Sequence, residues 1–244
     1  MIPVPLHDVL EILPAPVFSF HQTGLTFPGA DSDNLCIRAY RLLEKEFQLP
    51  PVYMHLRKII PMGAGLGGGS SDAAWVLKGL NMIFNLGLSN VQLEEHAAQL
   101  GSDCPFFIAN APQMAGGRGE VLSSSDVDLS GYYIKLVNPG LHVGTAEAYA
   151  GVHFSDDYPA LEELLRKPIS EWKMNVENDF ERSVFKRYPE IERIKHQLYS
   201  EGAVFAQMSG SGSTVYGIYK EEPTKSFTHH SDYLEVVKQF PLNF

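Results

Sequence analysis

The chain has 244 residues, 44% of them hydrophobic and 20% charged, which is typical of a soluble globular protein with one large domain or two closely packed ones. The formal net charge of −10 argues against a general nucleic-acid binder, and no apolar run approaches the ~20 residues that a membrane span needs. Since the N-terminus also lacks the basic start and apolar core of a secretory signal, we expect a cytoplasmic protein with free thiols at Cys36 and Cys104.

The first sixty residues predict strands around one helix. A short strand is expected over residues 9–12, and another strand or a hairpin over residues 18–27. Residues 31–33 are candidate helix caps, and apolar residues then recur at helical spacing: Leu35, Ala39, Leu42, Leu43 and Phe47. Residues 52–60 alternate, with Val52, Met54 and Leu56 on one face, which predicts a strand that leads into a glycine-rich loop.

Two helices are expected after that loop. The first has one apolar stripe made of Ala73, Leu77, Leu80 and Phe84, and Ser70 or Ser71 is its expected cap. For the second helix, Ser89 and Gln92 form a candidate capping box, and Gly101 is the expected stop.

The remainder of the chain mixes both kinds of element. The expected elements are a strand over residues 132–137, a short helix over 145–150, a mostly helical stretch over 158–198, a strand, glycine turn and strand over 203–219, and a short element near 234–240. Because strands and helices do not alternate regularly, the sequence predicts an α+β architecture with two lobes that meet near residues 140–155.

The most informative segment is the glycine-rich run between the predicted strand at 52–60 and the helix that follows it. Its residues are Pro61, Met62, Gly63, Ala64, Gly65, Leu66, Gly67, Gly68, Gly69, Ser70 and Ser71. A backbone without side chains lets N–H groups approach a phosphate, and the following helix adds the positive end of its dipole. We therefore predict a cradle for nucleotide phosphates; the alternative is a tight turn that is packed for geometry alone.

Three familiar nucleotide-binding classes do not fit this run. A P-loop needs a lysine, and the run has none. A dinucleotide fold needs an acidic residue ~20 positions further on, and residues 84–90 contain no carboxylate. The downstream signatures of protein kinases are also missing.

The run from Pro61 to Ala74 resembles the phosphate-binding motif of the GHMP kinases, and its triple glycine with two serines is most similar to the 4-diphosphocytidyl-2-C-methyl-D-erythritol kinase branch. Residues 101–108 resemble the segment that carries this branch's catalytic aspartate, and residues 208–213 resemble the superfamily's C-terminal glycine motif. Residues 116–120 and 178–181 also fall where the branch has similar sequence. The resemblance is specific because three separate motifs occur in the right order.

This resemblance implies a two-lobed fold. The N-terminal lobe, residues 1–145, is expected to lead from the glycine loop into a helix, and the C-terminal lobe, residues 146–244, to hold an antiparallel sheet with helices. The implied activity is ATP-dependent phosphorylation of a hydroxyl of 4-diphosphocytidyl-2-C-methyl-D-erythritol, in the non-mevalonate isoprenoid pathway. Mg²⁺ is inferred from ATP chemistry rather than from a ligand cluster.

The expected partner is a small-molecule substrate, with no nucleic acid and no membrane, and the expected state is a monomer or homodimer. Two alternatives stay open. One is another GHMP small-molecule kinase, of the homoserine or mevalonate type. The other is a nucleotide-binding module without turnover.

Asp103 is the expected catalytic base. Without the resemblance it is typical of a surface turn or helix cap before Pro105. The resemblance gives it the role of accepting the proton of the attacking hydroxyl, or of orienting that hydroxyl. The glycine loop would hold the β- and γ-phosphates, and Ser70 and Ser71 would bond phosphate, ligate Mg²⁺ or cap the helix.

A second small-residue loop consists of Ser209, Gly210, Ser211 and Gly212. It is either a hairpin turn or, as the resemblance implies, a loop beside the first glycine loop that approaches phosphate closely. Arg57 and Lys58, just before the cradle, either raise the local positive potential or form a solvated strand end.

The chain departs from the branch at its start. In the branch, a strand with a lysine that assists the aspartate precedes everything seen here, and this chain has no lysine before Lys45. A shortened chain or misassigned start codon is the favoured explanation, and a degenerate kinase is the other. We expect weak activity from this chain and full activity from an extended one, because an acid–base partner contributes ~10²–10⁴-fold in rate.

Overall fold

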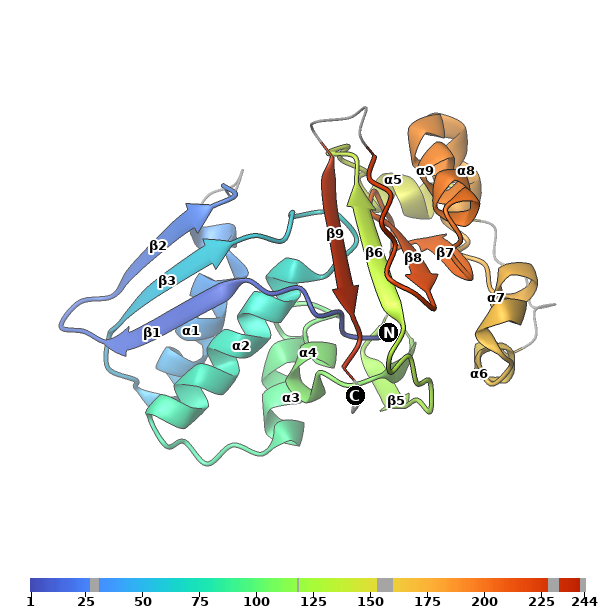
Figure 1. Cartoon of the computed structure of the whole chain (residues 1–244). Helices are drawn as coiled ribbons and strands as arrows, with labels where there is room; N and C mark the ends of the chain where they lie inside the picture. The colour runs from blue at the N-terminus through green and yellow to red at the C-terminus, as the bar shows by residue number, and fades with distance from the viewer. Residues whose placement is uncertain (27–30, 118, 153–159, 228–232, 242–244) are drawn as a thin grey trace. The chain divides into compact units, whose positions relative to one another are not determined.

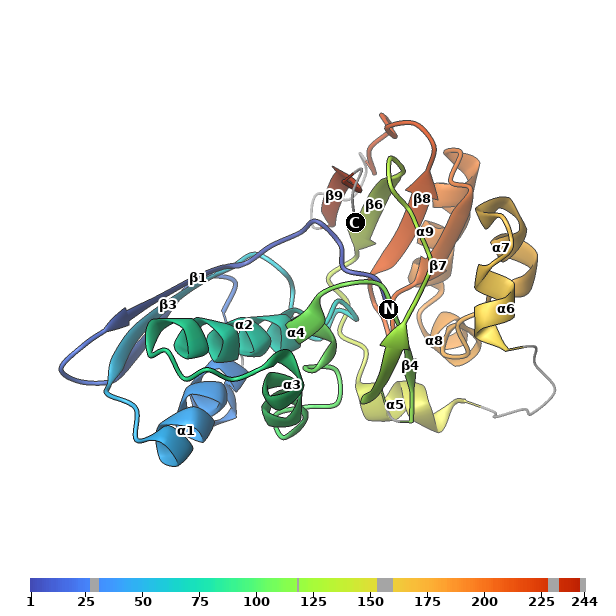
Figure 2. The ribbon, with the colours of Figure 1, turned by 90° about the horizontal axis from the view of Figure 1, so that it is seen from below.

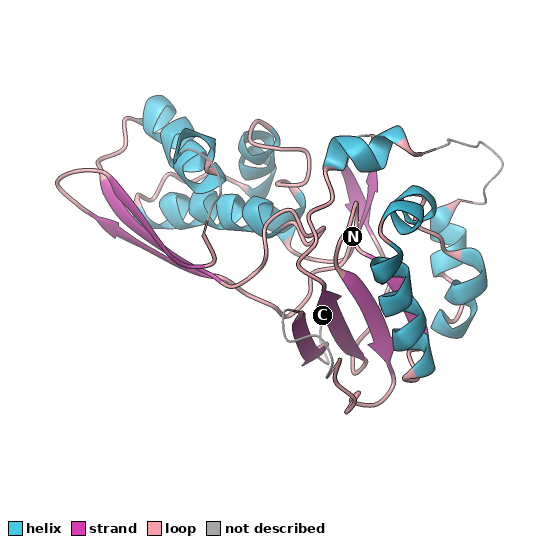
Figure 3. Cartoon of the chain, turned by 90° about the horizontal axis from the view of Figure 1, so that it is seen from above, coloured by secondary structure: helices cyan, strands magenta, loops and turns pink. Residues whose placement is uncertain are grey.

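The computed structural model describes residues 1–26, 31–117, 119–152, 160–227 and 233–241 (Figure 1). The chain folds into two compact units, Met1–Met62 with Gly67–Ser125 and Gly63–Leu66 with Asp126–Phe244. Both units contain helices and strands (Figure 3), which confirms the α+β expectation. The division of two lobes at residues 145 and 146 stays a prediction. In the described ranges, no helix has both the length and the apolar character to cross a bilayer.

The first unit is a three-stranded sheet with helices on one face (Figures 1 and 2). Its strands lie in the order β1 (Val9–Pro14), β3 (Val52–Lys58), β2 (Ser19–Gly24), with β1 antiparallel and β2 parallel to β3. The helices are α1 (Leu35–Phe47), α2 (Gly68–Ile83) and α3 (Asn90–Ala98). The alternation expected in β3 is confirmed, because Val52, Met54 and Leu56 are all buried in the core.

Of the helix caps predicted from the sequence in this unit, one is confirmed and two are wrong. The capping box of Ser89 and Gln92 at α3 is confirmed. Residues 31–33 are not the cap of α1; they form a short 3-10 helix, η1 (Asp31–Asp33), and the side chain of Asn34 caps α1 by accepting from the amide of Cys36. The capping role of Ser70 or Ser71 is also wrong, since α2 begins at Gly68 with Gly67 as a cap that has no side chain.

Three short elements of the first unit were missed. A helix of one turn, α4 (Phe106–Ala109), follows Pro105, and β4 (Gln113–Gly116) pairs antiparallel with β5 (Val121–Ser124). Each strand has four residues and little burial, so neither shows a usable alternation. Arg118, in the turn between these two strands, is outside the described residues.

The second unit is a four-stranded antiparallel sheet in the order β7-β8-β6-β9, with helices packed against it. Its strands are β6 (Tyr133–Asn138), β7 (Phe205–Met208), β8 (Val215–Tyr219) and β9 (Leu234–Gln239). The helices are α5 (Thr145–Ala150), α6 (Leu161–Leu165), α7 (Ile169–Asn175), α8 (Glu181–Arg187) and α9 (Pro189–Ser200). The expected antiparallel sheet with helices is therefore confirmed; residues 158 and 159 of the expected helical stretch lie outside the described residues.

Candidate active site

The first turn of α2 presents backbone amides with no partner. Ser71 is the first residue of this helix whose amide is bonded, to the carbonyl of Gly67 at 2.9 Å. Within the described part of the chain, the amides of Gly68, Gly69 and Ser70 donate to no acceptor. Because Gly67 has no side chain to cap them, these three N–H groups and the positive end of the helix dipole are available to an anion.

Two glycines in front of these amides have backbone conformations that other residues rarely adopt. Gly65 has a φ of +75° and Gly67 a φ of +63°. A Cβ on Gly67 would lie 2.8 Å from Cζ of Phe107, so a side chain there would require the ring of α4 to shift. Gly67 thus allows close packing in the run, which also leaves amides exposed, and the phosphate cradle stays a prediction.

Asp103 lies in the turn between α3 and α4, next to the buried residue Cys104. Burial raises the pKa of the Cys104 thiol, and the side chain of Ser70, in the first turn of α2, offsets part of that effect. Asp103 itself is exposed, and its Oδ1 accepts from the hydroxyl of Ser102 at 3.3 Å. A carboxylate that water can reach therefore follows Ser102 and precedes a thiol that is influenced by Ser70.

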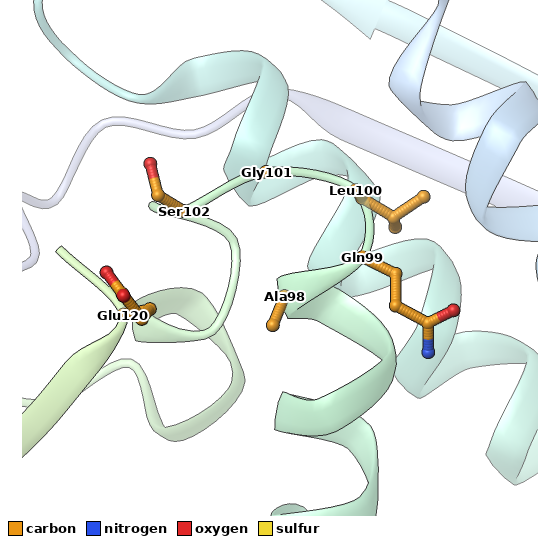
Figure 4. Close-up of a pocket in the computed structure, with 6 residues that line it drawn as sticks. All are labelled: Ala98, Gln99, Leu100, Gly101, Ser102 and Glu120. Atoms are coloured by element: carbon orange, nitrogen blue, oxygen red, sulfur yellow. The ribbon is translucent and has the colours of Figure 1, made fainter. Parts of the chain in front are cut away.

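The turn of the β4–β5 hairpin lies against Asp103. A Cβ on Gly119 would come within 3.3 Å of Asp103 Oδ1. Beside it is a hollow of about 370 Å³, shown in Figure 4, that is lined by Ala98, Gln99, Leu100, Gly101, Ser102 and Glu120. The lining is mixed: Ala98 and Leu100 are apolar, whereas Gln99, Ser102 and Glu120 bring polar groups that can form hydrogen bonds with a ligand.

Lys58 is a buried cation beneath the start of α2, and sequence reasoning missed it. Its side chain is 1% exposed, and its ammonium lies 2.5 Å from Asp8 Oδ2 and 2.6 Å from Asp72 Oδ2. The other oxygen of Asp8 accepts from the amides of Ile59 and Ile60. The solvated strand end considered from the sequence is therefore wrong for Lys58, which connects the ends of β3 and α2.

Asp72 is the member of this ionic group whose pKa is raised by burial. Burial raises its pKa from 3.8 to about 6, and the charge of Lys58 offsets only part of that effect. The residue before β1, the end of β3 and the second turn of α2 are held together by charges that all lie inside the protein. The sequence shows no spacing that would have revealed this group, because its members are 14 and 50 positions apart.

The second small-residue loop contacts the first glycine loop within the second unit. The hydroxyl of Ser209 donates to the carbonyl of Gly65 at 2.7 Å, and the amide of Thr214 donates to the carbonyl of Ala64 at 3.2 Å. A Cβ on Gly65 would lie only 2.0 Å from the carbonyl oxygen of Ser209. The turn at Ser209, Gly210, Ser211 and Gly212 thus touches residues 64 and 65, as the resemblance implied.

The described residues contain no carboxylate cluster that could ligate a metal. Among the described residues, no three His, Cys, Asp or Glu side chains converge on a point where an ion would sit. Mg²⁺ in nucleotide sites commonly uses one or two protein ligands together with phosphate oxygens and water. The oxygen donors available at the start of α2 are the hydroxyls of Ser70 and Ser71, a set that fits Mg²⁺ bound largely through a nucleotide.

Comparison with known proteins places these features in a family. Residues 34–110 match the family model described as GHMP kinases N terminal domain, and residues 155–227 match that described as GHMP kinases C terminal. Two proteins named 4-diphosphocytidyl-2-C-methyl-D-erythritol kinase are similar to the chain. The one from Bacteroides fragilis is 51% identical, over 90% of this chain and 82% of the relative, and the one from Cytophaga hutchinsonii is 48% identical, over 91% and 82%.

A solved structure gives the same result for the fold. The crystal structure of a 4-(cytidine 5'-diphospho)-2C-methyl-D-erythritol kinase superimposes with a TM-score of 0.76 at 30% identity and covers 94% of this chain and 85% of its own.

Proposed function

Because the chain belongs to the GHMP kinases, and within them to the 4-diphosphocytidyl-2-C-methyl-D-erythritol kinase family, we propose that it phosphorylates 4-diphosphocytidyl-2-C-methyl-D-erythritol. In this reaction the γ-phosphoryl group of ATP passes to a hydroxyl of the methylerythritol, a step of the non-mevalonate isoprenoid pathway. The observation that carries the proposal is the set of free amides at Gly68, Gly69 and Ser70, at the start of the helix that follows the glycine run.

The free amides would bind the β- and γ-phosphates of ATP. During phosphoryl transfer, negative charge spreads over the phosphoryl oxygens, and fixed N–H donors aimed at them stabilise the transition state. The dipole of α2 acts in the same direction. When bound with ATP, Mg²⁺ neutralises charge on the β- and γ-phosphates, and the hydroxyls of Ser70 and Ser71 are its candidate protein ligands.

Asp103 would act as the base. Its carboxylate is exposed and, among the described residues, accepts a hydrogen bond only from Ser102, so it has an oxygen to offer the substrate hydroxyl. It would take the proton of that hydroxyl as the oxygen attacks phosphorus, or orient the hydroxyl for attack. The turn at 209–212 would support the glycine run through its contact with Gly65.

The proposal extends to the cellular setting. We propose a cytoplasmic monomer or homodimer that takes small-molecule substrates and binds neither nucleic acid nor membrane; of these points, the net charge of −10 supports the absence of a nucleic-acid partner.

A substrate panel tests this function. The purified chain is incubated with ATP and Mg²⁺ and, in separate reactions, with 4-diphosphocytidyl-2-C-methyl-D-erythritol, homoserine, mevalonate or phosphomevalonate, at enzyme concentrations that detect slow turnover. We expect formation of ADP and a phosphorylated product with the cytidine substrate only. Turnover of another acceptor would change the substrate assignment, and nucleotide binding without any turnover would favour a binding module.

A further inference from the structure

We propose that Asn178 and Glu181 are positioning residues for the phosphate loop, a role that rests on the proposed function. Both belong to the stretch Asn178, Asp179, Phe180 and Glu181. The motif resemblance includes this stretch but assigns no role to its residues. Asn178 lies just before α8, and Glu181 is the first residue of that helix. Their side chains are directed at the backbone of the turn that touches Gly65.

Asn178 holds two carbonyl groups of this turn. Its amide nitrogen donates to the carbonyl of Met208 and to that of Gly210, each at 2.8 Å. Its oxygen accepts from the amide of Phe180 at 3.0 Å, which fixes the orientation of the amide group. Only a side chain with two donors on one nitrogen and an acceptor beside it forms all three bonds.

Glu181 binds the same turn through the amide of Met208, whereas Asn178 binds the carbonyl of that residue. Its Oε1 accepts from the amide of Met208 at 2.8 Å, and its Oε2 accepts from the ammonium of Lys195 at 2.5 Å. Glu181 is buried, so Lys195 keeps a charge balanced that would otherwise be costly inside the protein. The amide and the carbonyl of Met208 are thus both bonded to side chains of one short motif.

The contacts continue to the first glycine loop. Ser209 lies between the two carbonyls that Asn178 binds, and its hydroxyl donates to the carbonyl of Gly65. A displaced turn would therefore move Gly65, which precedes Gly68, the first residue with a free amide, by three positions in the chain. Misplacement of a reacting group by about 1 Å is enough to slow a reaction ~10²-fold. If Asn178 and Glu181 served only to hold β7 and β8 together, their replacement would lower the stability of the protein and leave nucleotide binding unchanged.

The test compares Asn178→Asp with the matched control Asn175→Asp. Asn175 also donates a side-chain bond to a carbonyl, that of Glu171 on α7, and it does not touch the turn. In the Asn178 variant a carboxylate faces two carbonyl oxygens and both donors are lost. Two quantities are measured: the Kd of the non-hydrolysable analogue β,γ-imido-ATP by calorimetry, and kcat with ATP. Thermal unfolding monitors stability in parallel.

We expect Asn178→Asp to weaken binding of the analogue or to lower kcat by at least ~10-fold, and Asn175→Asp to change neither by more than ~2-fold. Glu181→Gln, which keeps an acceptor for Met208, should retain more activity than Glu181→Leu. If Asn178→Asp does not fold, Asn178→Ala against Asn175→Ala replaces that pair. Unchanged Kd and kcat in a folded Asn178 variant would overturn the positioning role. An unmodified chain that binds the analogue but turns over no acceptor would contradict the proposed function and leave the Kd comparison intact.

Discussion

The ammonium of Lys58 lies 2.6 Å from a carboxylate oxygen of Asp72, and both side chains are nearly inaccessible to water. A Cβ on Gly68 would come within 3.0 Å of the same ammonium nitrogen. The end of β3 is therefore joined to the beginning of α2 by a buried ion pair, and changes to this pair should alter the stability of the first unit.

Replacement of Lys58 by methionine should destabilise the protein strongly. Asp8 and Asp72 would then share the buried site without a cation, and breaking a buried pair in this way costs about 3–5 kcal/mol. Lys45→Met is the matched control, since Lys45 is exposed on α1 and its loss should change stability by no more than ~0.5 kcal/mol. Chemical denaturation measures both variants, and similar free energies of unfolding for the two would contradict the role of Lys58.

Asp72 should give stability a recognisable pH dependence. Its pKa is about 6 in the folded protein against an ordinary 3.8, so the folded state takes up a proton more readily than the unfolded state. The corresponding stability is fully present below the unfolded pKa and is lost as the pH rises through 6. Asp72→Asn cannot take up this proton, so the unfolding free energy of the unmodified chain should fall relative to that of the variant between pH 4 and 6.

The slope of that difference is at most ~1.4 kcal/mol per pH unit, the value for one proton. Urea denaturation of both proteins at several pH values in this range measures it. A difference that stays flat, or that grows with pH, would show that Asp72 is not the group responsible.

Replacement of Gly65 by alanine should impair ATP binding because the alanine Cβ would collide with the Ser209 carbonyl oxygen, in addition to the backbone strain. Alanine at Gly65 has both an unfavourable φ of +75° and a Cβ 2.0 Å from the Ser209 carbonyl oxygen, whereas at Gly202, φ +101°, nothing lies within 4 Å. Both variants carry the strain, so the difference between them measures the contact. We expect Gly65→Ala to raise the KM for ATP by at least ~10-fold and Gly202→Ala to leave it unchanged. Equal KM values would mean that this contact does not shape the nucleotide site.

Patterns local in sequence were read correctly. The alternation of Val52, Met54 and Leu56 and the capping box at Ser89 depend only on neighbouring residues, and both are present in the structure. The start of α2 was misjudged because serines are common caps, whereas here Gly67 takes that position and leaves the amides free. The usual preference for a side-chain cap fails here, and the amides that it would have bonded are the ones proposed to bind phosphate.

Interactions between distant residues could not be predicted. Lys58 looked like a solvated strand end because its partners, Asp8 and Asp72, come close only after folding. The same holds for Asn178, whose bonds reach the turn about 30 positions later. The role of Asp103 was expected from the resemblance alone and stays a prediction, while its exposure and its bond from Ser102 required the structure.

Replacement of Asp103 by asparagine tests the proposed reaction most directly. The variant keeps the size of the side chain and an acceptor for Ser102 and removes the base, and Asp33→Asn, an exposed aspartate of the same unit, is the control. At saturating ATP and 4-diphosphocytidyl-2-C-methyl-D-erythritol, we expect kcat to fall by ~10²–10⁴-fold in Asp103→Asn, with the Kd of β,γ-imido-ATP unchanged, and to stay at the unmodified value in Asp33→Asn. A kcat in Asp103→Asn within ~3-fold of the unmodified chain would contradict proton transfer to this carboxylate.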